Sequence, residues 1–146
     1  MTRPTHLDPR LVALVAAGGA VGTTARWALS EAVGSTAGGW PTATFIANLV
    51  GSFLLGVLLE SLLRRGPESA RGRLVRLGVG TGVLGGFTTF SSLVLELERL
   101  LAAGQVAIGI AYGVTSLVLG LVACLLGVAL AARHVQARLP LDPDAA

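Results

Sequence analysis

Polar side chains recur along one face of an apolar segment near the middle of the chain. Thr44, Asn48 and Ser52 are four residues apart, so on a helix they share one face. The Asn48 amide offers two N–H donors and an acceptor oxygen. In hydrocarbon, a polar side chain that is retained needs a partner or a function. The pattern therefore indicates either a donor to a ligand or a hydrogen bond that only holds two helices together.

A second polar group follows two glycines in the next apolar segment, in the run Gly85-Gly-Phe-Thr-Thr-Phe-Ser-Ser92. Glycine and hydroxyl residues weaken a helix, and broken helices at membrane depth are tolerated where they are buried in protein or line a cavity. Carbonyls freed by such a break can coordinate a cation. A continuous helix with small residues at a crossing is the alternative.

The last apolar segment carries a weaker polar track, and the first carries a single interior charge. Tyr112 and Ser116 are four residues apart, with Gly120 one turn further, and core packing explains them better when the track is considered alone. Arg26 lies toward the end of the first segment, where it either extends to the interface or forms an electropositive vestibule. We expect a polar interior made almost entirely of neutral donors, with no carboxylate at mid-membrane, which suits a small anion.

Four apolar segments must position these side chains. Charged residues are absent from three long gaps, each long enough for a helix of about 20 residues to cross the hydrocarbon core; the gaps are Glu31–Glu60, Arg76–Glu96 and Arg99–Arg133. The runs do not alternate as the strands of a transmembrane β-barrel do. Three later spans also make an uncleaved first helix a simpler account than a signal peptide.

The sequence thus predicts an all-α membrane protein with one four-helix transmembrane domain over residues 1–146. We place the helices at about 11–33, 41–63, 74–101 and 105–132, with the third broken near its middle. Polar tails are predicted at 1–10 and 133–146.

Composition excludes several other classes of protein. The net charge of +3 comes with 11 basic residues that are all Arg and lie mostly in predicted loops, as membrane topology requires, and aromatic residues are only 5%. We therefore reject nucleic-acid binding. The single Cys124 excludes an internal disulfide and a cysteine-based zinc site. No intramembrane serine has a positioned base, so an enzyme is not predicted.

Glycines recur at four-residue spacing in three of the segments: Gly18 and Gly22; Gly78, Gly82 and Gly86; Gly109 and Gly113. Small residues at this spacing let helix backbones approach closely. They serve either packing within one subunit or packing against a second copy, and their number leads us to expect an oligomer.

These features together resemble the Fluc (CrcB-type) fluoride channel family over most of the chain, from about Gly18 to Gly120. The resemblance lies in Gly19-Ala-Val-Gly22 with Arg26-Trp27, in Thr44-Phe-Ile-Ala-Asn48-Leu-Val-Gly51-Ser52-Phe53, and in Gly85-Gly-Phe-Thr-Thr-Phe-Ser91. The last motif, with Asn48 on the preceding helix, is the specific one.

The resemblance implies an antiparallel dimer of four-helix subunits with two pores that passively export cytoplasmic fluoride. It implies that Asn48 donates to fluoride and that Phe90 presents a ring edge to the ion. The implied pore track comprises Thr44, Ser91, Ser92, Tyr112 and Ser116, and Arg26 belongs to the vestibule. Backbone carbonyls of Gly85 and Thr88 would hold a structural Na⁺ at the dimer centre.

Two positions depart from the family pattern, in which a second pore phenylalanine and a further serine are usual. Here these positions are Leu93 and Gly120. Leucine lacks a polarised ring edge and glycine lacks a hydroxyl, so we expect one of the two pores to be impaired.

Loop charges predict a single orientation with both termini cytoplasmic, and the resemblance implies a bacterial inner membrane. The termini share a side with the 64–76 loop, and that side carries Arg3, Arg10, Arg64, Arg65, Arg71, Arg73, Arg76, Arg133 and Arg138. Positive residues stay cytoplasmic. Because an antiparallel homodimer needs both orientations, we predict pairing with a related, oppositely oriented subunit.

Two other functions remain open. A small multidrug-type proton-coupled exporter also has four short helices, but it uses a carboxylate in helix 1, where this chain has only Glu31 at the end. A non-conducting membrane assembly subunit is the other.

Overall fold

A computed structural model describes residues 8–34 and 39–136, and the described residues are helical apart from short connections. The elements are α1 (Pro9–Val33), α2 (Thr42–Leu63), α3 (Ala70–Val75), the π-helical η2 (Arg76–Leu84), α4 (Gly85–Phe87), α5 (Phe90–Ala102) and α6 (Val106–Gln136). The predicted tails lie partly outside these residues, at 1–7 and 137–146.

Within the described residues, four helical stretches are long and apolar enough to cross a membrane: Pro9–Val33, Thr42–Leu63, Ala70–Ala102 and Val106–His134. The all-helical, four-span architecture predicted from the charge-free gaps is thereby confirmed. The third stretch begins at Ala70, earlier than expected, because Ser69 caps it by accepting a hydrogen bond from the Gly72 N–H at 3.1 Å. It ends before Gly104, whose φ of 76° few other residues adopt.

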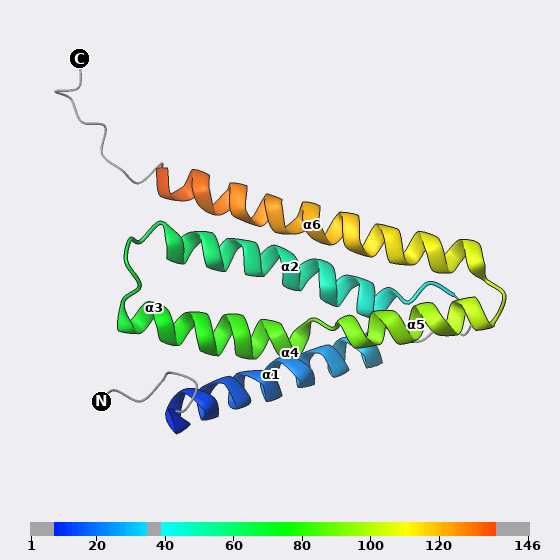
Figure 1. Ribbon diagram of the computed structural model, residues 1–146, viewed down its shortest axis with the longest axis horizontal. Coiled ribbons are helices and arrows are strands. Elements are labelled where there is room, and N and C mark those ends of the chain that lie inside the picture. Colours follow the sequence, from blue (N-terminus) through cyan, green and yellow to red (C-terminus); the bar gives the residue numbers. More distant parts are fainter. Residues whose placement is uncertain (1–7, 35–38, 137–146) are drawn as a thin grey trace, which may run out of the picture.

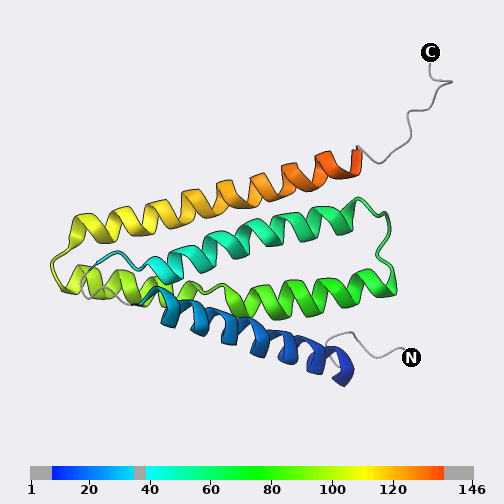
Figure 2. The ribbon, with the colours of Figure 1, turned by 180° about the vertical axis from the view of Figure 1, so that it is seen from behind.

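The four stretches form an elongated bundle (Figures 1 and 2). α6 lies alongside α2, while α1 lies along η2 and α4 on the opposite flank (Figure 1). The start of α1, the α2–α3 connection and the end of α6 gather at one end of the bundle. The α5–α6 turn lies at the other (Figure 2). The basic loop and the two described chain ends are therefore on the same side.

Glycines hold α1 against the third stretch. A Cβ on Gly18 would run into the Gly78 carbonyl oxygen, and one on Gly86 would lie 2.5 Å from the Gly19 carbonyl oxygen. These positions therefore place two backbones in direct contact. The predicted glycine spacing at 18, 22, 78, 82 and 86 thus serves packing inside one subunit, so it gives no support for a second copy.

This contact makes a stability prediction with a matched control. Gly18→Ala is expected to lower the free energy of unfolding by about 1–3 kcal/mol, because the new methyl must push η2 away. Gly19→Ala meets no atom within 4 Å and gains up to about 1 kcal/mol of helix propensity. Unfolding of both variants in mixed micelles measures the difference, and equal stability would show that α1 and η2 do not pack this way.

The third stretch departs from a regular α-helix in two places. Residues Arg76–Leu84 form a π-helix, which the sequence analysis did not anticipate. Its buried Gly78 and Gly82 lie against α1 and its buried Gly80 lies against Leu58 of α2, so a wider turn fits between the two helices. Such π-helical segments are frequent at functional sites. Further on, Thr88 (φ −79°, ψ 155°) and Thr89 (φ −151°, ψ 123°) are extended between α4 and α5.

Candidate functional site

A groove of about 430 Å³ brings together polar residues from three spans. α2 contributes Asn48 and Ser52, the segment between α4 and α5 contributes Thr88 and Thr89, and α6 contributes Ser116. Residues that are far apart in the sequence thus share one cavity, together with Phe90, Leu93 and Gly120. Part of each polar face recognised in the sequence therefore lines one site, whereas Thr44, Tyr112, Ser91 and Ser92 do not line this groove.

Asn48 forms a two-way hydrogen bond with the backbone of Thr89. Its Nδ2 donates to the Thr89 carbonyl at 2.9 Å, and its Oδ1 accepts from the Thr89 N–H at 2.8 Å. One of the two amide N–H groups thus keeps the chain in place. The second N–H remains to serve a ligand in the groove, so the structural and the ligand-binding interpretations of Asn48 are compatible.

The extended threonines release carbonyl groups from the helical pattern. In a continuous helix the Thr89 N–H would donate to the Gly85 carbonyl, but here it donates to Asn48. The next carbonyl, of Gly86, accepts from Arg26 Nε at 3.3 Å and from Thr23 Oγ1 at 3.5 Å. Arg26 thus contacts the end of α4 and lines none of the grooves described here.

The hydroxyl groups around the groove differ in their environment. Thr89 Oγ1 donates to Ser92 Oγ at 3.2 Å and lies 3.2 Å from Ser91 Oγ, and Ser91 is exposed. Ser116 Oγ is buried in the groove and has no hydrogen-bond partner within the described residues. A buried hydroxyl without a partner is uncommon, so Ser116 is a candidate donor to a bound ligand.

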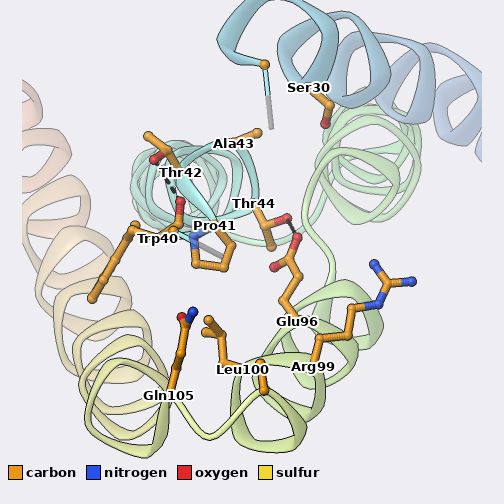
Figure 3. A pocket seen from close by; sticks show the side chains of 13 residues that line it. Ser30, Trp40, Pro41, Thr42, Ala43, Thr44, Glu96, Arg99, Leu100 and Gln105 are labelled. Carbon is orange, nitrogen blue, oxygen red and sulfur yellow. Dashed lines mark hydrogen bonds between the residues drawn. The ribbon is translucent and has the colours of Figure 1, made fainter. Parts of the chain in front are cut away.

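A second polar cluster lies toward the α5–α6 turn, at a pocket of about 440 Å³ (Figure 3). Glu96 of α5 points toward α2 and accepts from Thr44 Oγ1 at 2.6 Å. Its other oxygen accepts from the Tyr112 hydroxyl of α6, also at 2.6 Å. The Trp40 ring packs edge-on against Tyr112, with the two ring centroids 5.4 Å apart.

Glu96 corrects one expectation from the sequence. We expected the polar interior to be made of neutral groups, yet Thr44 and Tyr112 are joined by a carboxylate between three spans. Glu96 is the first charged residue after a charge-free gap, so the sequence pattern indicates the end of a membrane span there and not an interior group. Its position four residues after Ser92, on the same helix face, was the available signal.

Metal binding by side chains finds no support in the described residues, where no group of three His, Cys, Asp or Glu is close enough to hold an ion. A cation at this site would have to be held by backbone carbonyls. Gly85 and Thr88 line the groove, and the carbonyl of Gly85 has lost its helical donor. Carbonyl oxygens are ligands that hard cations accept, so the donor set fits such an ion.

Comparison with known proteins places this chain in a family. The family described as "CrcB-like protein, Camphor Resistance (CrcB)" matches residues 13–128, which include parts of all four spans and the whole groove. The chain belongs to the CrcB family. The resemblance drawn from the sequence motifs is therefore confirmed.

Curated relatives in the CrcB family carry a functional name. The fluoride-specific ion channel FluC 2 of Leifsonia xyli is 47% identical over 129 residues, which is 88% of each chain. The fluoride-specific ion channel FluC 1 of Cutibacterium acnes is 47% identical over 112 residues, covering 77% of this chain and 78% of the relative. FluC 1 of Mycobacterium bovis is 42% identical over 130 residues, which cover 89% of this chain and 96% of the relative. The family is one of ion channels, not enzymes.

Proposed function

We propose that this chain is one subunit of a fluoride-selective passive channel that exports cytoplasmic fluoride. The observation that carries the proposal is the groove in which an Asn48 N–H and the unpartnered Ser116 hydroxyl face one cavity. The names of the relatives supply the ion.

The chemistry of the groove suits fluoride. A small anion gives up its water only where other donors replace the hydrogen bonds it loses. Conduction also requires binding weak enough for the ion to leave. An amide and a hydroxyl provide fixed neutral donors without a full positive charge that would trap the anion.

The proposed channel needs a second subunit. The Phe90 side chain is 71% exposed although it lines the groove. In hydrocarbon the extended backbone beside this ring requires cover, because unpaired backbone is tolerated at this depth only when it is buried in protein or lines a cavity. An antiparallel partner would supply this cover and complete two pores with ring edges that favour an anion.

Na⁺ would take a structural place at the dimer centre. The carbonyls of Gly85 and Thr88 from each subunit would hold it between the two extended segments. A bound cation there supplies positive charge that holds four carbonyl dipoles together. This chain's own contribution is to keep the Gly85 carbonyl out of the helix, through the Asn48–Thr89 hydrogen bonds.

We further propose that the partner is a related chain of opposite orientation. The arginines in the described residues at the α2–α3 end of the bundle are Arg10, Arg64, Arg65, Arg71, Arg73, Arg76 and Arg133. Such a bias favours one orientation, with this end and both termini on the cytoplasmic side of a bacterial inner membrane. An identical antiparallel copy would have to insert against its own charge bias.

The two departures from the family pattern lie in the groove itself. Leu93 is buried beside Phe90, and Gly120 lies one turn beyond Ser116. The pore that they line would lack one ring edge and one hydroxyl. We therefore propose that the conducting pore of the pair draws more of its donors from the partner.

Liposome efflux tests the proposal. We expect no fluoride efflux from liposomes holding this protein alone, and rapid fluoride efflux without chloride efflux once a related chain is added, as measured with ion-selective electrodes. Efflux from the protein alone, with both orientations present, would overturn the heteromeric pairing but not the channel. No efflux with any related chain would favour a non-conducting assembly subunit.

A proton-coupled exporter is the second candidate, because Glu96 supplies a carboxylate inside the bundle. Both of its oxygens already accept hydrogen bonds, and Glu31 is exposed at the end of α1. Efflux that proceeds without a proton gradient would exclude this exporter. Organic-cation transport that depends on the gradient and on Glu31 would favour it.

A further inference from the structure

A third groove, of about 650 Å³, lies at the basic end of the bundle, away from the channel residues. Its walls are formed by the end of α2, the α2–α3 connection, α3 and the beginning of η2, and a residue near the end of α6. Aliphatic side chains such as Leu59, Leu63 and Val128 line its length, and Arg65 and Arg71 stand beside them. The groove therefore combines an apolar wall with cationic groups.

The acidic residues near this groove are already neutralised. Glu60 is paired with Arg64 on the next turn of α2, and Glu68 is paired with Arg76 at 2.6 Å. The hydrogen bond from Arg76 holds the pKa of the Glu68 carboxyl below its ordinary value, so Glu68 stays charged and occupies Arg76. Arg65 and Arg71 are exposed, and neither has an ion pair within the described residues. They form the uncompensated positive charge of the groove.

We propose that this groove binds the headgroup of an anionic phospholipid, with the phosphate on Arg65 and Arg71 and an acyl chain along Leu59 and Leu63. Guanidinium groups match phosphate oxygens in a planar two-bond geometry. Basic pockets between transmembrane helices at the cytoplasmic side bind anionic headgroups in this way.

The apolar wall decides between a lipid and a free phosphate compound. Leu63 is 74% exposed and Leu59 43% exposed, and both lie in the last turns of α2, the second membrane-spanning stretch. A soluble anion would leave these side chains uncovered, whereas an acyl chain covers them while its headgroup reaches the arginines. The site is independent of conduction, because it shares no residue with the groove around Asn48.

Native mass spectrometry of the full chain in detergent, titrated with phosphatidylglycerol or phosphatidylcholine, tests the proposal. We expect preferential binding of phosphatidylglycerol. The double variant Arg65→Gln/Arg71→Gln should weaken this binding by about tenfold, because each arginine near an anionic lipid contributes to the free energy of binding. Glu68→Gln should strengthen it, because Arg76 is then released. Arg65 and Arg71 are exposed and make no ion pair within the described residues, so their double variant should keep the wild-type unfolding midpoint. Glu68→Gln breaks an exposed ion pair with Arg76, and such pairs contribute little to stability.

The matched control is Arg10→Gln/Arg133→Gln, which removes two exposed arginines from the same end of the bundle but outside the groove. It should leave phosphatidylglycerol binding nearly unchanged. An equal loss in both double variants would show general charge attraction and overturn the site. Displacement of the lipid by millimolar inorganic phosphate would overturn it too, because a free anion would then be the preferred occupant.

Discussion

Asn48→Asp is expected to abolish fluoride efflux in a chain that still folds with reduced stability, because the new oxygen cannot donate to the Thr89 carbonyl. The aspartate keeps an oxygen for the Thr89 N–H, so the extended segment retains one of its two anchors. It loses the donor that faces the groove and places a negative charge beside the passing anion. Two unit charges about 4 Å apart repel by about 4 kcal/mol at an effective dielectric constant of about 20, which corresponds to roughly a thousandfold.

The measurement is the initial rate of fluoride efflux in whichever liposome preparation conducts, with the unfolding midpoint of each protein beside it. Asn48→Ala serves as a comparison, because it removes both hydrogen bonds to Thr89 and should lower stability as well as conduction. An Asn48→Asp protein that is folded and still conducts at the wild-type rate would show that Asn48 only holds the helices together.

Glu96→Ala is expected to lower the free energy of unfolding by about 3 kcal/mol or more. Its carboxylate accepts from Thr44 of α2 and Tyr112 of α6, and hydrogen bonds to a charged group contribute about 1.5–3 kcal/mol each. The substitution also leaves the fully buried Tyr112 hydroxyl and the buried Thr44 hydroxyl without their acceptor. Three spans would lose their shared contact at once.

Glu98→Ala is the matched control, because Glu98 is exposed on the same helix and makes no ion pair within the described residues. Its removal should change stability by less than about 0.5 kcal/mol. Unfolding in mixed micelles, with near-ultraviolet circular dichroism of the Trp40 and Tyr112 rings, reports both effects. Equal losses in the two variants would mean that Glu96 does not join the spans.

Glu96 also limits which hydroxyl groups could donate to a conducted anion. The Glu96 carboxyl group accepts the hydrogen bonds of the Thr44 and Tyr112 hydroxyls, so these two groups are not free to donate to an anion in this conformation. Their predicted place in the pore track therefore depends on Glu96 moving away, whereas Asn48 and Ser116 have donors available as they stand.

The sequence by itself determined the number of spans and their order. Long gaps without charge and the clustering of arginines decide these properties, because a charge in hydrocarbon is costly wherever the helix lies. The i, i+4 spacing of Thr44, Asn48 and Ser52 likewise placed them on one face, since helical geometry is local. The family followed from short motifs that need no tertiary information.

Only the tertiary structure decided what those residues contact. Thr89 is four residues from Gly85 along the chain, yet its N–H donates to Asn48, because α2 crosses the third span at that level. In the same way, the packing of α2 and α6 against α5 places Glu96 where its carboxyl group accepts hydrogen bonds from both neighbouring spans. Partners of this kind depend on where helices cross. The glycine spacing predicts that backbones approach closely, but only the tertiary structure shows which backbones meet, as at Gly18 and Gly78.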